Sequence, residues 1–119
     1  MKLAADVLVA LVALLHVWFL VLEMFLWDKP LGLKTFRHSA AEAASSKVLA
    51  ANQGLYNGFL AAGLAWSLLA PSDNARPLAL FFLACVLVAG IYGGFSANKR
   101  IWLLQALPAA LALLVVIFS

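Results

Sequence analysis

The side chains that could do chemistry in this sequence are polar groups embedded in long apolar stretches. Glu23 and His16 are the two ionisable candidates, and they lie seven positions apart in the first stretch. On an α-helix this spacing places them within about 20° of each other around the axis and about 10 Å apart along it. An ionisable side chain in hydrocarbon costs about 2.5 kcal/mol or more, which makes it a functional candidate by default. Glu23 is therefore the first candidate for a binding or proton-exchanging group, and His16 is the second. The alternatives are that Glu23, near the end of its stretch, reaches headgroup water and that His16 is a neutral histidine bonded to a neighbouring helix.

Six further polar side chains lie in the later apolar stretches. With about 1.5 Å of rise per helical residue, all six fall at roughly the depth of Glu23. They are Asn52, Gln53, Tyr56, Asn57, Tyr92 and Gln105. Together with Glu23 they predict a polar pocket within the membrane that opens toward the cytoplasm, with His16 at its floor. The alternative is structural, since such side chains also join helices at about 1 kcal/mol or less per contact.

The second apolar stretch has two expected faces. Asn52, Gln53 and Tyr56 fall on one arc of a helix, with Asn57 at its edge. The small residues on the opposite side are Gly54, Gly58, Ala61 and Ala65. Small side chains let another backbone approach closely, so we expect this side to pack against a neighbouring helix.

The elements that must position these residues follow from the composition. Of the 119 residues, 66% are apolar and only 11% are charged, whereas a soluble globular protein carries about 25% charged residues. Four apolar runs come close to the roughly 20 residues that a helix needs to cross the hydrocarbon core. They cover residues 4–27, 48–69, 77–96 and 101–118. The sequence therefore predicts an all-α polytopic membrane protein, a compact four-helix transmembrane bundle that forms one domain over residues 1–119.

The connection after the first run combines basic and apolar residues. We expect residues 28–39 to form a loop that lies on the lipid headgroups. Ser39 followed three positions later by Glu42 is a capping-box pattern. It predicts that the second helix begins near Ala40, several residues outside the membrane.

Proline and glycine mark the later connections. Pro77 suits the first turn of the third helix, and residues 98–100 form a tight link to the fourth. Pro108 is expected to kink the fourth helix unless its freed carbonyl partner is bonded elsewhere. Gly90, Gly93 and Gly94 in the third run indicate close helix packing.

The distribution of Lys and Arg predicts the orientation. One side of the membrane would hold six of them, namely Lys29, Lys34, Arg37, Lys47, Lys99 and Arg100, and the other would hold Lys2 and Arg76. Because basic residues favour cytoplasmic loops, we expect a multi-pass protein of the bacterial cytoplasmic (inner) membrane with both termini on the non-cytoplasmic side.

Several chemistries find no motif here. The sequence has no nucleotide-binding loop, no zinc-type His or Cys spacing and no serine nucleophile elbow. His16 and His38 differ too much in depth to form a haem pair. The single cysteine, Cys85, has no partner for a disulfide. We expect no metal and no cofactor, and the net charge of +3 needs no nucleic-acid partner to explain it.

Three segments carry a resemblance to a known family. They are residues 16–27 (HVWFLVLEMFLW), 52–58 (NQGLYNG) and 91–93 (IYG). Together they resemble a family of small four-helix bacterial membrane proteins known as the domain of unknown function thirteen-oh-four. The resemblance spans nearly the whole chain and implies the same four-helix fold, but it implies no activity, cofactor or substrate.

Three classes of function remain open. The first is a carrier or binding protein for a small polar or amphipathic molecule, with Glu23 exchanging protons and with homo-oligomers supplying the pathway. The second is a membrane enzyme for a lipid or apolar substrate, with Glu23 or Tyr92 as acid or base and His16 assisting. The third is an accessory protein whose polar face docks a partner helix. The catalytic residues, if there are any, remain unassigned, and membrane lipids are expected partners in all three classes.

Overall fold

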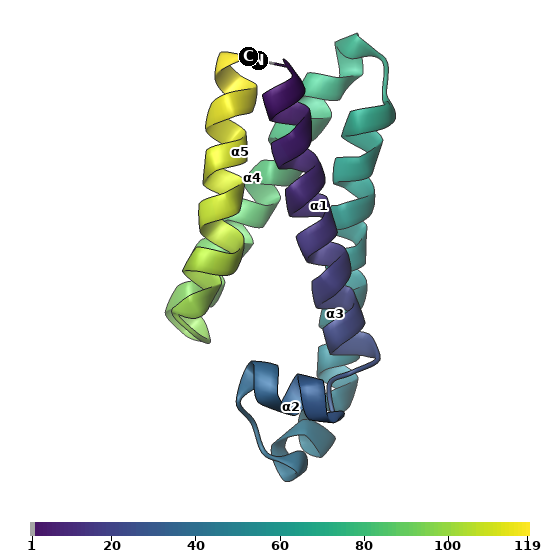
Figure 1. Cartoon of the computed structure of the whole chain (residues 1–119), viewed down its shortest axis with the longest axis vertical. Coiled ribbons are helices and arrows are strands. Elements are labelled where there is room, and N and C mark those ends of the chain that lie inside the picture. Colours follow the sequence, from purple (N-terminus) through teal and green to yellow (C-terminus); the bar gives the residue numbers. More distant parts are fainter. Residues whose placement is uncertain (1) are drawn as a thin grey trace. The chain divides into compact units, whose positions relative to one another are not determined.

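A computed structural model of the chain describes residues 2–119, and it is helical almost throughout (Figure 1). The elements in chain order are α1 (Lys2–Met24), α2 (Pro30–Phe36), α3 (Ala40–Leu69), α4 (Ser72–Ser96), the π-helical turn η1 (Trp102–Ala106) and α5 (Leu107–Phe118). No strand occurs within residues 2–119. The predicted all-α class is confirmed.

Two of the helices are long and apolar enough to cross a membrane, α1 and α4. The apolar stretch Trp102–Phe118, formed by η1 and α5, is shorter. The second expected span, residues 48–69, is the later part of the longer helix α3, which begins at Ala40.

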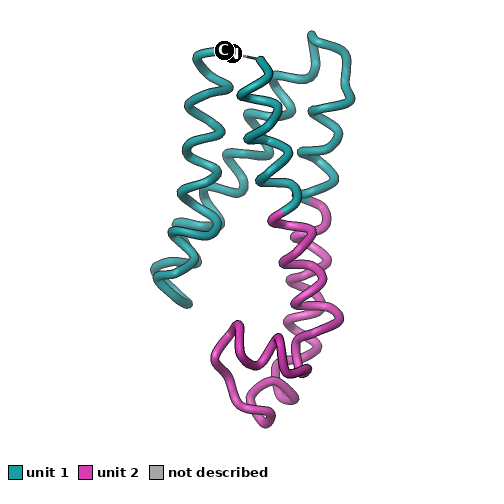
Figure 2. The backbone as a smooth tube through the Cα atoms, in the orientation of Figure 1, with its two compact units in different colours: residues 1–14, 60–119 teal, residues 15–59 magenta. Residues whose placement is uncertain are grey.

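The chain divides into two compact units, which Figure 2 colours separately. Unit 1 comprises the chain up to Leu14 together with Leu60–Ser119, and unit 2 comprises Leu15–Phe59. Helices α1 and α3 each contribute residues to both units.

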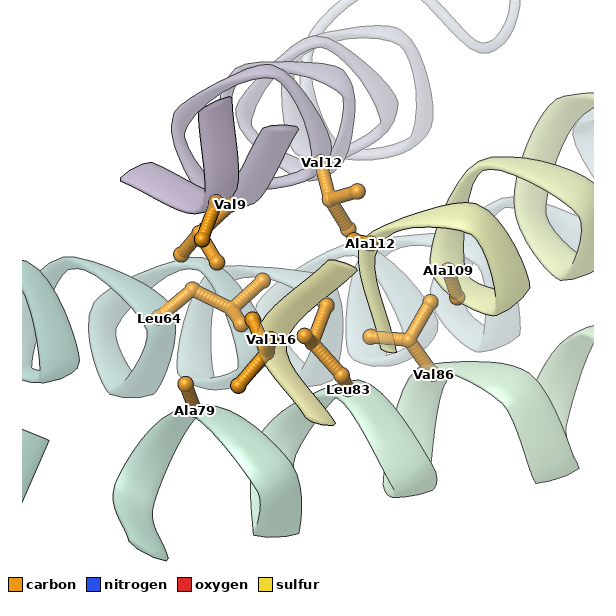
Figure 3. Close-up of a cluster of buried hydrophobic side chains, with 10 residues drawn as sticks. Val9, Val12, Leu64, Ala79, Leu83, Val86, Ala109, Ala112 and Val116 are labelled. Atoms are coloured by element: carbon orange, nitrogen blue, oxygen red, sulfur yellow. The ribbon is translucent and has the colours of Figure 1, made fainter. Parts of the chain in front are cut away.

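Unit 1 has a core of small and branched apolar side chains (Figure 3). Val9, Leu64, Leu83 and Val116 bring together α1, α3, α4 and α5, and each is at most 5% exposed. Alanines such as Ala112 complete the core and let the helices approach closely. This core positions the four helices that contribute to unit 1.

Glycines on α4 contact the segment that follows it. A Cβ at Gly90 would lie 2.6 Å from the backbone nitrogen of Ala106, and one at Gly94 would overlap the indole of Trp102. The Trp102 indole nitrogen also donates a hydrogen bond to the carbonyl of Ile91 at 3.2 Å. The close packing expected at Gly90 and Gly94 is thus confirmed.

Two prolines sit differently from the expectation. Helix α4 begins at Ser72, so Pro77 lies inside the helix rather than in its first turn. Pro108 lies in the first turn of α5, directly after the π-helical turn η1. A π-helical turn pairs each N–H with the carbonyl five residues earlier, and the N–H of Leu107 does this with Trp102. The irregularity expected at Pro108 therefore takes the form of a wider turn just before it.

Unit 2 contains the connection between α1 and α3, and here the expected boundaries need correction. Helix α1 ends at Met24, not at residue 27. The N–H of Leu26 bonds at 3.2 Å to the carbonyl of Val21, five residues back, which already accepts the N–H of Phe25 at 3.0 Å, so the α-helical pattern stops there. The expected loop 28–39 contains the short helix α2, with Pro30 in its first turn. Arg37 ends α2 in the left-handed conformation, with φ of 54°.

The start of α3 agrees with the capping-box prediction. The Ser39 hydroxyl accepts a hydrogen bond from the Glu42 N–H at 3.1 Å, and the Glu42 carboxylate accepts one from the Ser39 N–H at 2.9 Å. These bonds lower the pKa of Glu42 below its ordinary value of 4.5. The helix accordingly begins at Ala40.

Candidate functional site

The candidate site lies in unit 2, where α1 and α3 are in close contact. Gly54 faces α1 directly: a Cβ there would lie 2.7 Å from Met24 Cγ, 3.1 Å from Glu23 Cβ and 3.3 Å from the Leu20 carbonyl oxygen. One turn later, a Cβ at Gly58 would lie 2.7 Å from Leu20 Cδ1. These two glycines mark the line along which α3 approaches α1.

Glu23 lies beside that line and is buried, with 4% of its surface exposed. Its Oε2 accepts a hydrogen bond from Gln53 Nε2 at 2.5 Å, and its Oε1 accepts one from Asn57 Nδ2. Gln53 and Asn57 are four residues apart on α3, so their side chains lie one above the other and can reach the same carboxylate. Glu23, Gln53 and Asn57 together are called the Glu23 cluster below.

The partners of Glu23 are neutral amides. No salt bridge to Glu23 occurs within residues 2–119; the two salt bridges there are Lys2 with Asp6 and Lys47 with Asp28. A buried carboxylate that lacks a cationic partner can take up a proton or a cationic ligand, because buried charges are normally paired. The Glu23 cluster is thus chemically suited to bind a proton, a cation or a hydrogen-bond donor.

His16 is the other ionisable candidate in unit 2. It is fully buried, and its ring meets the ring of Phe19 edge-on with 5.2 Å between centroids. An imidazole packed in this way is consistent with a structural role as well as with the predicted pocket floor.

Two of the candidates on α3 point away from the glycine line. Asn52 is exposed, and Tyr56 is 56% exposed, with its ring 5.7 Å from that of Phe59. With about 100° per residue, both lie roughly 160° around α3 from Gly54. The single polar arc expected on this helix therefore divides into two groups, and Gln53 and Asn57 form the group that reaches Glu23.

The last two candidates belong to unit 1. Tyr92 lies on α4 and is 72% exposed. Gln105 is half-buried in the π-helical turn η1.

Unit 1 also contains a cavity that sequence reasoning missed. Its volume is about 220 Å³, and Lys2, Asp6, Ser67 and Arg76 are among its lining residues. The Arg76 guanidinium donates hydrogen bonds to the carbonyl oxygens of Val116 at 2.8 Å and of residue 117 at 3.0 Å. Cations near a helix C-terminus commonly satisfy its free carbonyls, and a lone arginine beside an apolar run was the available signal.

No group of three His, Cys, Asp or Glu side chains among residues 2–119 is placed to hold a metal ion. Hydrogen bonding, proton exchange and the pairing of a cation with a carboxylate are the chemistry that the Glu23 cluster offers.

The helices and the Glu23 cluster define an all-helical protein with two long apolar helices and a carboxylate buried between α1 and α3. The profile of the family described as "Protein of unknown function (DUF1304)" matches residues 10–117. The chain belongs to this family, and the resemblance inferred from its sequence motifs is confirmed.

A comparison with individual proteins also finds a bacterial relative. The chain is 33% identical over 116 residues to the "Uncharacterized protein YpaA" of Lactococcus lactis subsp. lactis (strain IL1403). The aligned region covers 96% of this chain and 97% of that protein. No solved structure matches the chain.

Proposed function

We propose that the chain is a multi-pass protein of the bacterial cytoplasmic membrane. The exposed apolar surface of its long helices supports this. In the most apolar 18-residue segment of α1, and likewise in that of α4, only 28% is buried. Leu14 on α1 and Val88 on α4 are 65% and 66% exposed. The core helix of a soluble protein would hide such side chains from water.

Four crossings fit the helix lengths. The 30 residues of α3 extend about 45 Å, more than the roughly 30 Å of hydrocarbon, so the turns that hold Glu42 and Lys47 would project into the headgroups. The apolar stretch Trp102–Phe118 would extend about 26 Å and would complete the fourth crossing. The excess of Lys and Arg in the connections around α2 and before η1 favours placing them in the cytoplasm.

Within this membrane protein, the Glu23 cluster is the proposed binding site of a carrier or binding protein for a small polar or amphipathic molecule. The observation that carries the proposal is a buried carboxylate whose two oxygens accept hydrogen bonds from the neutral amides of Gln53 and Asn57. Ionisable groups within a membrane commonly mark substrate pathways or proton relays. Loading and release of a proton at Glu23 would couple ligand binding to pH.

A binding site must be reached by water, whereas a purely structural contact need not be. Access of water to the Glu23 cluster can be tested by thiol labelling, because Cys85→Ser removes the single natural cysteine. In that background, the Asn57→Cys variant is treated with a charged, membrane-impermeant thiol reagent. Leu55→Cys is the matched control, because Leu55 lies at the same depth on α3 and is 42% exposed without being part of the cluster. We expect Asn57→Cys to react when the reagent reaches the cytoplasmic face and Leu55→Cys to stay unreacted. Equal reaction of both, or of neither, would mean that the cluster only joins helices.

The proton-linked part of the proposal needs a functional readout. Proteoliposomes that contain the pH-sensitive dye pyranine are exposed to a library of small polar and amphipathic compounds. The Glu23→Gln variant keeps the shape of the side chain and can still hydrogen-bond to Gln53 and Asn57, so folding should persist. We expect compound-dependent proton flux in the natural protein and none in this variant; flux that survives Glu23→Gln would contradict the role of the carboxylate.

We also propose that the chain forms homo-oligomers. Asn52 and Tyr56 present polar groups on an exposed face of α3, and neither side chain has a hydrogen bond within residues 2–119. In hydrocarbon such groups favour contacts with polar groups on another helix. In the Cys85→Ser background, Asn52→Cys is expected to form an intermolecular disulfide in lipid, and failure to crosslink would argue against this face as the interface.

A further inference from the structure

The short helix α2 is held firmly to the rest of unit 2. The ring of Trp27 packs against Phe36 and His38, with centroid distances of 4.6 and 4.5 Å. Its indole nitrogen donates a hydrogen bond to the Ser46 hydroxyl at 3.0 Å, and His38 Nε2 lies 3.1 Å from the Trp27 carbonyl oxygen. Aromatic pairs of this kind contribute beyond their buried area. The orientation of α2 is therefore set by the contacts that the Trp27 ring makes with Phe36 and His38 and by the hydrogen bond that joins its indole to Ser46 on α3.

One face of α2 packs against the turn that follows α1. A Cβ at Gly32 would overlap the carbonyl oxygen of Leu26 and come within 2.8 Å of that of Trp27. Lys34 lies about 160° around the helix from Gly32, and Leu31 lies about 60° from Lys34. Both are exposed, Leu31 at 45%. The outward face of α2 thus combines a cation with an apolar side chain.

The cations around α2 lack ion-pair partners. Lys29 and Arg37, which flank the helix, are exposed like Lys34, and none of the three makes a salt bridge within the described part of the chain. The two acids of the segment are engaged elsewhere. Asp28 pairs with Lys47 at 2.9 Å, which lowers the pKa of that carboxyl, and Glu42 caps α3.

We propose that the exposed side chains Leu31 and Lys34 of α2, together with the flanking Lys29 and Arg37, form a docking surface for anionic phospholipid headgroups. Ammonium and guanidinium groups complement a lipid phosphate, and the exposed Leu31 side chain can enter the acyl boundary beside it. An acidic protein or a nucleic acid would match the charge but would leave Leu31 in water. This surface goes beyond the proposed ligand site, which lies on other residues, although it relies on insertion of the chain in a membrane.

The position of α2 in the chain favours a lipid surface as the occupant. It follows directly after the apolar helix α1, and Phe25 at the junction is 64% exposed. Membrane-interface segments commonly place aromatic and basic residues together where an apolar helix ends. Trp27 and Lys29 stand at this junction.

The test compares two variants with the same loss of charge. The full chain, purified in a neutral detergent and freed of lipid, is titrated with phosphatidylglycerol, and bound lipid is counted by native mass spectrometry. Lys29→Gln combined with Lys34→Gln removes two cations from the α2 surface, whereas Lys2→Gln combined with Lys99→Gln removes two exposed lysines elsewhere. Arg37 is left in place because its left-handed conformation ends α2.

A lysine near an anionic surface strengthens binding roughly fivefold, so the α2 variant should bind phosphatidylglycerol roughly twenty-five-fold more weakly. The control variant should lose less than about fivefold. Phosphatidylcholine, which is zwitterionic, should bind all three proteins alike, and circular dichroism should show equal helix content.

Three results would overturn the proposal. Equal losses in both variants would mean that only total charge matters. No preference of the natural protein for phosphatidylglycerol over phosphatidylcholine would leave α2 without a lipid partner. Competition by inorganic phosphate at the same concentration as the lipid would indicate a small-anion site. None of these results bears on thiol labelling at Asn57, so the two proposals fail separately.

Discussion

Close contact between α1 and α3 at Gly54 predicts an unusual sensitivity to a single methyl group. In Gly54→Ala the new Cβ would meet Glu23 Cβ at 3.1 Å and the Leu20 carbonyl oxygen at 3.3 Å. Neither atom can move by side-chain rotation, so the two helices must separate slightly. At Gly58 the new Cβ would meet only Leu20 Cδ1, at 2.7 Å, and that methyl can swing aside.

The difference between the two variants in free energy of unfolding measures the cost of overpacking at Gly54. Replacing Gly by Ala within a helix gains about 0.5–1 kcal/mol of backbone free energy, and this gain is common to both positions. Overpacking that forces backbone shifts costs about 1–3 kcal/mol. We therefore expect the free energy of unfolding of Gly54→Ala to be lower than that of Gly58→Ala by about 1–3 kcal/mol, with Gly58→Ala close to the natural protein or above it.

Reversible unfolding by SDS in mixed micelles, followed by circular dichroism, measures these free energies. A helix separation at Gly54 should also disturb the hydrogen bonds from Gln53 and Asn57, so the carboxyl infrared band of Glu23 should shift in Gly54→Ala and stay in place in Gly58→Ala. If the two variants unfold alike, or if Gly58→Ala is the weaker one, the inferred contact between α1 and α3 is wrong.

Three further predictions follow from other contacts. Gly90→Ala should be less stable than Gly93→Ala by about 1–3 kcal/mol, because the new Cβ at Gly90 would lie 2.6 Å from a backbone atom, whereas at Gly93 it would meet only a side chain at 3.1 Å. The same SDS titration measures both free energies of unfolding, and equal values would contradict the packing of α4 on η1. The pKa of Glu42 is lowered in the folded state, so the contribution of this carboxylate to stability is present above pH 4.5 and is lost as the pH falls through the lowered folded pKa. Glu42→Gln and Ser39→Ala should both flatten this part of the curve of stability against pH. An unchanged curve would refute the capping role. A reporter fused after the last residue should report the non-cytoplasmic side of the membrane, and a reporter inserted after α2 should report the cytoplasm. A cytoplasmic C-terminus would reverse the proposed orientation.

Much of the helix pattern can be predicted from local sequence because the signals are local. The start of α3 at Ala40 follows from Ser39 and Glu42, whose reciprocal bonds need only a three-residue spacing. Gly90 and Gly94 indicate close packing without any knowledge of the partner helix. In each case a short stretch contains all the atoms that decide the outcome.

The departures depend on contacts between distant positions. Helix α2 lies in a stretch that reads as an interfacial loop, and what holds it is the packing of Trp27 on Phe36 and His38. The π-helical turn η1 precedes Pro108 and places Trp102 against Gly94 of α4. Neither arrangement has a periodic signature in the sequence. Hydropathy alone therefore predicts no helix at α2, and it predicts one uninterrupted apolar run where η1 and α5 occur.

The candidate site shows why depth in the membrane is a weaker guide than direction around the helix. Relative to Gly54, which faces α1, about 100° per residue places Asn57 at roughly −60° and Gln53 at roughly −100°. Asn52 and Tyr56 fall at roughly ±160°, although they share the same depth. The glycines identify the contact line, and the polar residues nearest that line are the ones that reach Glu23. Angles measured from Gly54 and Gly58 therefore separate the two polar groups, whereas Gly63, about 180° from Gly54, marks a different contact, with Phe82 of α4.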